Sequence, residues 1–169
     1  MPHNKKLILD NKIFTRDVIR MGKKVYNLQY AKDHPEGRTI AAKSTGEWYS
    51  KAVVVPPFVF LSGMSGRTFE TGKVESMDVR VQTRRCFSKI KVILDEVGTT
   101  PDNIIKYTHY IARREDIPAV IEETVKWFEK NVGPSFWKNP PACTLTVAGL
   151  YTPDMLVEID AIAILPENK

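Results

Sequence analysis

Two carboxylates interrupt an otherwise apolar stretch near the end of the chain. Glu158 and Asp160 lie in the segment LVEIDAIAIL, whose other residues are those that form protein cores. If this segment is a strand, residues two apart point to the same face, so the two carboxylates lie side by side. An ionised carboxylate buried there is costly unless it is paired or hydrogen-bonded. The pattern indicates either a rim carboxylate that meets a Lys or Arg, or a general acid/base that holds water in a cleft between subunits.

A second candidate is the segment LSGMSGR, residues 61–67. A strand that ends in Ser62–Gly63 lets the backbone approach a ligand closely, because glycine has no Cβ. Backbone N–H groups in the loop that follows can hold an anion. Arg67 can then clamp a carboxylate with its planar guanidinium. The same spacing also suits an ordinary connection between a strand and a helix.

The cysteines and histidines give weaker signals. The two cysteines, Cys86 and Cys143, cannot form a disulfide framework, and no Cys/His spacing suggests zinc, so we expect neither a metal nor another cofactor. No histidine follows Cys143, and His109 lies inside a predicted strand. We therefore expect Cys143 to be a buried, unreactive thiol and His109 a packed or edge residue. The sequence contains no Ser-His-Asp order, P-loop, GxGxxG or HExxH motif.

The bulk composition is that of an ordinary globular protein. The chain has 169 residues, enough for one domain with a proper core, and is 43% hydrophobic and 27% charged. Its net charge of +5 is spread along the chain without a block of like charges, so nucleic acid is not the expected partner. Neither a signal peptide nor a membrane span is visible, which favours the cytoplasm and no contact with a membrane.

The spacing of apolar residues predicts the elements that position these candidates. Strands are expected around 26–30, 52–55, 58–62 and 103–112, with a closing pair within 140–165, and helices over 76–97 and 116–131. Two helices on one face of a mixed sheet give an α+β fold. The strands carry apolar residues on both sides, so copies of the same chain are expected to cover the other face in a symmetric oligomer.

Taken together, these segments resemble the Rid/YjgF family of reactive-intermediate (enamine/imine) deaminases over about residues 46–165. GEWYSKAV is similar to the family's entry strand, with Lys51 where glutamine is common, and VFLSG to its strand ending in Ser-Gly. DVRVQTRRCFSKIKVILDEVGTTPDNIIKYTHYI follows its pattern of Gln-Thr-Arg, helix, glycine and Thr-rich strand. LVEIDAIAIL is similar to its closing strand. Each motif is weak alone, but their order and spacing are fairly specific.

The resemblance implies a chorismate-mutase-like α+β fold assembled as a homotrimer, with clefts between subunits that bind a small-molecule substrate without a cofactor. It implies that Glu158 holds the water that attacks an imine carbon, and that Tyr49 and Ser62–Gly63 line the cleft. Residues 46–169 would form the Rid/YjgF-like domain. Residues 1–45 exceed the usual family length and would form an N-terminal extension with short strands and a loop.

The sequence departs from the family at the arginine that grips the substrate carboxylate. Family deaminases of amino-acid-derived imines carry Pro-x-Arg before the penultimate strand, where this chain has PPACTLTV. Counting back from Glu158 without a gap places Cys143 at the arginine position, and counting from Leu150 with one extra turn residue places Ala142 there. Neither side chain can bind a carboxylate. The segment SGMSGRTFETG and the longer final turn look most like 2-aminomuconate deaminases, which keep an arginine where Arg67 stands.

The favoured function is a cofactor-free deaminase that hydrolyses an enamine or imine of a small acid, the unsaturated class being preferred, to a carbonyl compound and ammonia. Glu158 would position water and shuttle protons, while Arg67 and the loop amides hold the anion. One alternative is a specialised pathway enzyme, such as a tautomerase or cyclase acting on a reactive intermediate in the same cleft. Another is a non-catalytic trimer that binds a metabolite or a protein partner. A nuclease is the least supported alternative.

Overall fold

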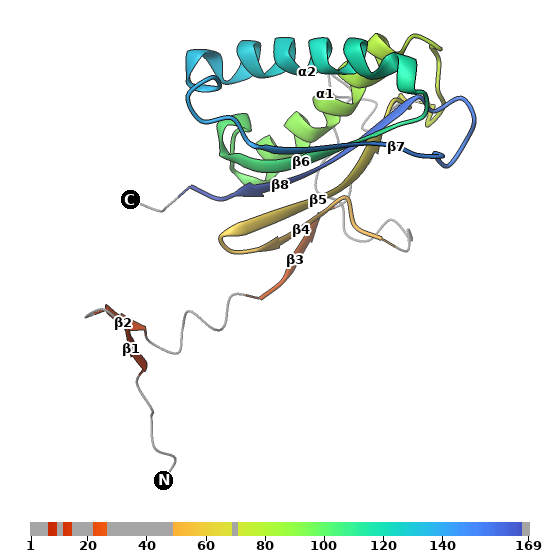
Figure 1. The fold of residues 1–169 in the computed structure, drawn as a ribbon. Coiled ribbons are helices and arrows are strands. Elements are labelled where there is room, and N and C mark those ends of the chain that lie inside the picture. The colour runs from red at the N-terminus through yellow and green to blue at the C-terminus, as the bar shows by residue number, and fades with distance from the viewer. Residues whose placement is uncertain (1–6, 10–11, 15–21, 27–48, 69–70, 167–169) are drawn as a thin grey trace.

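The computed structural model of the chain describes residues 7–9, 12–14, 22–26, 49–68 and 71–166 (Figure 1). The strand expected around 26–30 is represented by residues up to 26, and the rest of that prediction lies outside the described residues.

A six-stranded mixed sheet is the centre of the fold (Figure 1). Its strands, in spatial order, are β3 (Lys24–Tyr26), β4 (Ala52–Val55), β5 (Phe58–Ser65), β8 (Val157–Ile164), β6 (Ile104–Ile111) and β7 (Ala142–Val147). All neighbours run antiparallel except β6 and β7, which are parallel. β1 (Leu7–Leu9) and β2 (Lys12–Phe14) form a separate antiparallel pair.

Two helices cover one face of the sheet (Figure 1). Helix α1 spans Val79–Val97 and begins after Asp78, whose Oδ1 accepts a hydrogen bond from the Arg80 N–H at 2.8 Å. It ends at Gly98, whose φ of 81° is the left-handed conformation that glycine adopts without strain. Helix α2 spans Ile117–Asn131. Short 3-10 turns lie at 101–103, 114–116 and 133–135. The predicted α+β architecture and both helices are therefore confirmed.

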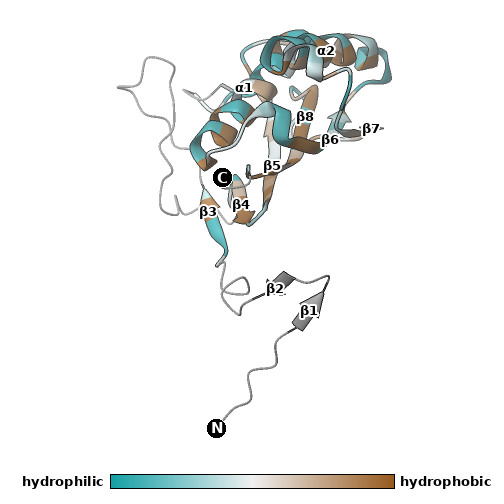
Figure 2. Cartoon of the chain, turned by 90° about the vertical axis from the view of Figure 1, so that its left-hand side faces the viewer, coloured by the Kyte–Doolittle hydropathy of each residue, from teal (hydrophilic) through white to brown (hydrophobic). Residues whose placement is uncertain are grey.

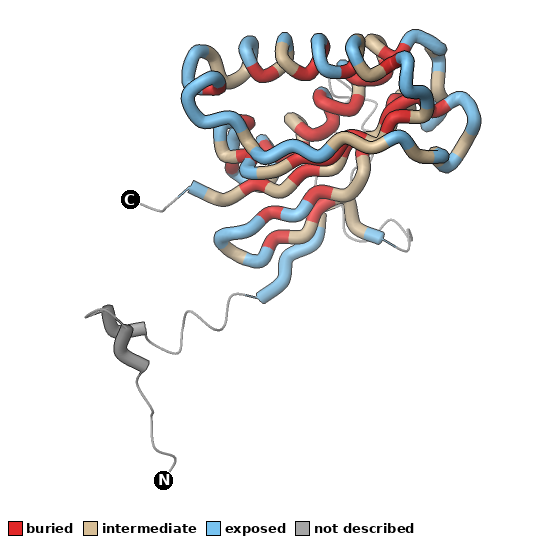
Figure 3. Tube along the Cα trace, in the orientation of Figure 1, coloured by how far each residue is buried: buried red, intermediate tan, exposed pale blue. Residues whose placement is uncertain are grey.

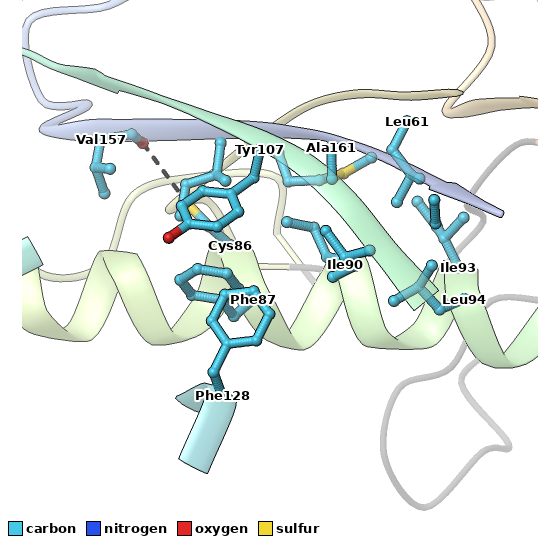
Figure 4. Close-up of a cluster of buried hydrophobic side chains, with 14 of the residues drawn as sticks. Leu61, Cys86, Phe87, Ile90, Ile93, Leu94, Tyr107, Phe128, Val157 and Ala161 are labelled. Carbon is cyan, nitrogen blue, oxygen red and sulfur yellow. Dashed lines mark hydrogen bonds between the residues drawn. The ribbon is translucent and has the colours of Figure 1, made fainter. Parts of the chain in front are cut away.

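The hydrophobic core lies between the helices and the sheet. Along β8 buried residues alternate with partly exposed ones (Figure 3). The buried ones belong to the core cluster between the sheet and the helices: Val157, Ile159, Ala161 and Ala163. Helix α1 contributes its own apolar side chains to the same cluster (Figure 4), and both helices show a hydrophobic and a hydrophilic side in Figure 2. Burial of such side chains is the main favourable contribution to folding. No helix in the described part of the chain is long and apolar enough to cross a membrane.

The opposite face of the sheet carries large apolar side chains and is covered by no helix of the described residues. Phe58 and Phe60 on β5 are each 44% exposed in the single chain, and their ring centroids lie 6.1 Å apart. In the register of β5 and β8, they pair with Ile164 and Ile162. The face that carries Phe58 and Phe60 also carries Glu158, so the candidate site lies at one end of this apolar surface.

Candidate functional site

The Ser62–Gly63 segment lies within β5 rather than at its end. The prediction of a strand that stops at Ser62 is therefore wrong, because the chain accommodates Gly63 in an irregularity of the pairing and continues to Ser65. The register of β5 against β8 shifts between Leu61 and Met64, as in a β-bulge. The Ser62 N–H donates to the Lys51 carbonyl at 2.9 Å, so this amide is occupied and does not hold an anion.

Gly63 makes room for the Glu158 side chain. A Cβ on residue 63 would lie 2.6 Å from Glu158 Cδ and would collide with Oε1. Such distances are far shorter than real carbon contacts, so any other residue would displace the carboxylate or the strand. Gly63 therefore allows the Glu158 carboxylate to lie directly against the β5 backbone.

Glu158 is half-buried, and both acidic and basic side chains act on its carboxyl group. Burial raises the pKa of its carboxyl above the ordinary value, and the negative charge of Asp160 raises it further. The positive charges of Lys51, Arg67 and Lys89 oppose this rise but do not cancel it. The result is a carboxylate that protonates more readily than usual within a group of cations, which suits both proton transfer and attraction of an anionic ligand.

The predicted shared face of the two carboxylates is confirmed by the strand register. Glu158 pairs with Tyr110 and Asp160 with Thr108, and both carboxylates lie on the helix-free face. The Tyr110 hydroxyl donates to Asp160 Oδ2 at 2.9 Å. Asp160 is thus held in place by Tyr110, at a position where its charge acts on Glu158.

Lys89 is a member of the site that the sequence reasoning missed. It is buried on α1, and its Nζ donates to the Ser65 carbonyl at 3.0 Å, next to Glu158 in the β5–β8 register. Burial lowers its pKa to about 8. A signal was present in the sequence, because position 89 lies on the apolar stripe of the helix, three residues after Cys86 and four before Ile93.

Lys51 and Tyr49 form a pair beside the Ser62–Gly63 segment. Lys51 Nζ donates to the Tyr49 hydroxyl at 2.6 Å and lies 4.2 Å from the centre of the Tyr49 ring. The Ser62 hydroxyl donates to the Ser50 carbonyl at 2.7 Å, and this hydrogen bond ties residues 49–51 to β5. Ser62 precedes Gly63, which contacts Glu158, whereas Tyr49 is connected to this group only through Lys51, whose charge acts on Glu158. Lys51 is thus an addition to the predicted residues, since in the sequence it stood out only as a departure from the family pattern.

Arg67 lies against the turn between β7 and β8. Its guanidinium is 5.4 Å from the centre of the Tyr151 ring, and Nη2 makes a long hydrogen bond of 3.5 Å to Thr152 Oγ1. These contacts are weak, so the guanidinium retains capacity to bind an anion. Its charge acts on Glu158, which places Arg67 at the same end of the sheet as the predicted site residues.

Gln82, on the first turn of α1, fixes this end of the sheet. The side chain is fully buried, and its Nε2 donates to the carbonyls of Ser76 and Asp154 at 2.8 and 2.9 Å. Its Oε1 accepts from the Leu156 N–H at 2.9 Å. A Cβ on Gly66 would collide with Gln82, so the chain passes closely over this side chain just before Arg67. Gln82 therefore connects the start of α1 to the turn that contacts Arg67.

Ala142 and Cys143 do not join this group within one chain. Ala142 pairs with Lys106 across β6, whereas Glu158 pairs with Tyr110, four residues further along that strand. Two strand spacings and four residues of rise separate them by roughly 16 Å. Ala142 lies on the same face of the sheet as Glu158, and Cys143, the next residue, lies on the face toward the helices.

The prediction that Cys143 is buried and inert is wrong in its first part. The residue is exposed, and its Sγ lies 3.8 Å from His109 Nδ1. The physical reason is that β7 is an outer strand of the described sheet, and its parallel register brings Cys143 next to a histidine 34 residues away in sequence. His109 itself is packed, as expected, with 1% of its surface exposed. In the described residues, no group of three or more His, Cys, Asp and Glu side chains could hold a metal.

Comparison with known proteins places this geometry in a family. The family model described as Endoribonuclease L-PSP matches residues 38–165. Reactive Intermediate Deaminase A of Arabidopsis thaliana is 34% identical over 117 residues, which cover 69% of this chain and 58% of that protein. The 2-iminobutanoate/2-iminopropanoate deaminase of Dermatophagoides farinae is 26% identical over 117 residues, covering 69% of this chain and 85% of that protein.

A solved structure with the same fold supports the assignment. YyfA of Yersinia pestis, described as a protein of unknown function of the conserved Rid protein family, has a TM-score of 0.66 and 25% identity, covering 85% of this chain and 100% of its own. The match of the family model over most of the chain, together with this likeness, shows that the protein belongs to the Rid/YjgF family.

Proposed function

We propose that this protein is a cofactor-free deaminase that hydrolyses an enamine or imine of a small unsaturated acid, the enamine reacting as its C=N tautomer. The observation that carries the proposal is the environment of the Glu158 carboxylate. It lies against Gly63, its pKa is raised, and the positive charges of Lys51, Arg67 and Lys89 act on it. The names of the relatives, reactive intermediate deaminase and 2-iminobutanoate/2-iminopropanoate deaminase, support the same reaction class.

Glu158 performs the proton transfers of this reaction. The carboxylate accepts a proton from a water molecule as the water oxygen attacks the imine carbon. The protonated carboxyl then gives that proton to the nitrogen, which completes the tetrahedral carbinolamine. Glu158 next takes the hydroxyl proton of the carbinolamine and passes it to the amino group, so that the C–N bond breaks, ammonia leaves and a carbonyl group remains. A raised pKa suits these proton transfers, because the carboxylate takes up a proton more readily than an ordinary glutamate does.

The substrate carboxylate is bound by cations around Glu158. Arg67 presents a planar guanidinium with weak internal contacts, and Lys51 lies beside β5, where its carbonyl accepts from the Ser62 N–H. An anion held there is attracted by both charges and placed next to the attacking water. This binding uses side chains rather than the Ser62 amide, which is already bonded.

The complete site is formed between copies of the chain in a homotrimer. The exposed Phe58 and Phe60 need cover on the helix-free face, which a second copy supplies. Ala142 shares the face of Glu158 but lies too far away within one chain, so a neighbouring copy must bring its β7 to Glu158. Since Cys143 points to the other face, Ala142 is the residue that occupies the family's arginine position.

Lys106 takes over the role of the missing arginine. It pairs with Ala142 in the register of β6 and β7, and its Nζ donates to Thr144 Oγ1 at 2.9 Å on the same face. We expect Lys106→Met to raise the KM for an anionic imine about tenfold, with a much smaller change in kcat, because a charge-assisted hydrogen bond to the carboxylate is lost. Steady-state kinetics measure both parameters.

Lys91→Met is the matched control for that substitution. Lys91 is on the surface of α1, where it pairs with Asp95 at 2.8 Å, so its loss removes the same charge away from the site. A KM that rises equally in both variants would attribute the effect to net charge, and an unchanged KM in Lys106→Met would remove Lys106 from the binding site.

Asp160→Asn is expected to move the acid limb of the pH dependence of kcat/KM to lower pH. The reaction needs ionised Glu158, and the charge of Asp160 is one cause of its raised pKa. Neutralising Asp160 lowers the pKa of Glu158, so activity survives to more acidic pH. Asp95→Asn is the control, because Asp95 pairs with Lys91 on the solvent-exposed side of α1. This variant is expected to keep the wild-type pH dependence of kcat/KM. A wild-type acid limb in Asp160→Asn would show that another group controls it.

The direct test of the proposal is ammonia release by the purified protein from freshly generated imines. 2-Aminoacrylate, a small monoanion, is compared with 2-aminomuconate, an unsaturated dianion. Faster release from the second is expected, because the cations around Glu158 and Lys106 can together bind two carboxylates, whereas the first substrate has only one. Release from 2-aminoacrylate alone would contradict the substrate class, and release from neither would contradict hydrolysis.

A nuclease function has less support from the site. RNA cleavage by general acid/base chemistry commonly needs an accessible imidazole. His109 is the one histidine in the described ranges, and it is 1% exposed on the helix-facing side of the sheet. The deaminase chemistry, by contrast, uses the half-buried carboxylate on the helix-free face.

A further inference from the structure

The turn between β7 and β8 holds an aromatic side chain out in solvent. Tyr151 is 85% exposed, more than any other large apolar side chain in the described part of the chain. A single exposed aromatic residue is common on protein surfaces and does not by itself indicate a site. Tyr151 differs in what it contacts, because the Arg67 guanidinium lies over its ring with Cζ 5.4 Å from the ring centre.

The exposure of Tyr151 does not come from a loose connection. The fully buried Gln82 holds the end of the same turn, since its Nε2 donates to the Asp154 carbonyl and its Oε1 accepts from the Leu156 N–H, both at 2.9 Å. Leu156 itself is 2% exposed, so the turn is anchored in the core. The Tyr151 ring is therefore presented by a backbone that is held in place.

Trp137 shows how packing explains an exposed ring elsewhere in this protein. It is 62% exposed, but its ring centroid lies 5.0 Å from that of Phe136, and its Nε1 donates to Glu129 Oε1 at 3.1 Å. Among the described residues, no aromatic ring packs against Tyr151, and its ring interacts with the Arg67 cation instead. Packing thus accounts for Trp137 but not for Tyr151.

The contact with Tyr151 leaves the hydrogen-bond donors of Arg67 usable. An aromatic ring covers the flat face of a guanidinium, whereas the N–H donors point outward in its plane. The Nη2 donor makes a long hydrogen bond of 3.5 Å to Thr152 Oγ1, and within the described residues the structure gives this guanidinium no other hydrogen bond. A carboxylate can therefore bind in the plane of the guanidinium, and it then lies beside the Tyr151 ring.

The Arg67–Tyr151 pair lies at the Glu158 end of the sheet. Arg67 follows Ser65 by two residues, and Ser65 pairs with Glu158 in the register of β5 and β8. The turn that carries Tyr151 leads into β8, whose second residue is Glu158. Figure 1 shows the end of β5 close to this turn, and the hydrogen bond from Arg67 to Thr152 joins them. A substrate whose reacting carbon lies at Glu158 can therefore extend toward Arg67 and Tyr151.

We propose that Tyr151 determines specificity for a conjugated acid, by covering the flat π system of a substrate whose carboxylate is bound by Arg67. A chain of conjugated double bonds continues the plane of the carboxylate, so it offers an aromatic ring a flat face to stack on. A saturated chain of the same length is bent and flexible and offers no such face. This role rests on the proposed function, in which Arg67 binds the substrate carboxylate, and it assigns the choice of the unsaturated class to Tyr151.

Isothermal titration calorimetry with two unreactive ligands tests this role. The ligands are trans,trans-muconate and adipate, dicarboxylates whose chains have the same length, the first conjugated and the second saturated, and neither has a nitrogen to release. Relative to the wild-type protein, Tyr151→Leu is expected to raise the Kd for muconate about fivefold and the Kd for adipate by less than about twofold. Tyr151→Phe keeps the ring and should retain both wild-type Kd values. Arg67→Met should raise both about tenfold, because it removes the partner of a carboxylate.

Each ligand is compared with itself between variants, so the difference in flexibility between muconate and adipate cancels. Equal changes in Kd for the two ligands in Tyr151→Leu would overturn the proposal by showing that the ring only positions Arg67. No change for either ligand would place the ring outside the site, and no measurable binding of muconate to the wild-type protein would also overturn the role.

The substitutions at residue 151 leave the core untouched, because Tyr151 is 85% exposed. The binding measurement is also independent of turnover. A preference for muconate that is lost in Tyr151→Leu, in a protein that releases no ammonia, would contradict the deaminase and leave the role of Tyr151 standing. An active deaminase in which Tyr151→Leu binds muconate as the wild-type protein does would contradict the role of Tyr151 alone.

Discussion

Replacing Glu158 with glutamine is expected to lower kcat for ammonia release by about 100-fold or more, because general acid/base catalysis contributes roughly this factor. The amide has the shape of the carboxyl and still fits over Gly63, but it cannot take a proton from water. The fold should not suffer. The pKa of Glu158 is raised in the folded chain, so at neutral pH its ionised form opposes folding, and glutamine removes that cost. Thermal unfolding of the variant is therefore expected at the wild-type temperature or slightly above it.

Asp160→Asn is the matched control for Glu158→Gln. Asp160 lies two residues away on the same face, is also partly buried, and undergoes the same change from carboxylate to amide. It is expected to retain most of its activity at neutral pH, since its role is to act on the pKa of Glu158. Equal losses in the two variants would show that the site needs negative charge rather than a base at residue 158.

Gly63→Ala is expected to abolish most of the activity and to destabilise the fold by about 1–3 kcal/mol, the range for forcing an extra methyl group into packed structure. The added Cβ collides with the Glu158 carboxyl, so either the catalytic side chain or β5 must move. Gly149→Ala is the control, because a Cβ there has no neighbour within 4 Å and its φ is not in the left-handed region. Activity assays and chemical denaturation of both variants test the expectation.

A double-mutant cycle identifies the cause of that destabilisation. In a Glu158→Ala background the colliding atoms are absent, so adding Gly63→Ala should cost much less free energy of unfolding than it does in the wild-type chain. The same cost in both backgrounds would mean that the backbone conformation, and not the contact with Glu158, requires glycine at residue 63.

Local sequence patterns were sufficient to predict most of the architecture. The apolar spacing of 76–97 and 116–131 gave both helices, with small differences at their starts, because helical amphipathicity is encoded within each segment. Period-two geometry placed Glu158 and Asp160 on one face without knowledge of their neighbours. At Gly63 the sequence predicted close approach of a ligand to the backbone, and the structure instead has the Glu158 side chain there.

The parts that failed depend on contacts between distant segments. Lys89 meets Ser65 across 24 residues, and Cys143 meets His109 across 34, so neither contact is visible in a local pattern. The bulge that carries β5 past Ser62 arises from its pairing with β8. Alternation along β7 predicts only that Ala142 and Cys143 face opposite sides, and the register of β6 with β7 and β8 was needed to learn which of them shares the face of Glu158.

The most direct test of the central claim is the ratio of ammonia released to 2-aminomuconate consumed. Both quantities are followed in the same reaction. Hydrolysis at Glu158 predicts one ammonia per substrate consumed, at a rate well above the protein-free reaction, with both signals lost in Glu158→Gln. Substrate consumed without ammonia would contradict the deaminase and favour a tautomerase or cyclase. Binding with neither signal would favour a metabolite-binding trimer.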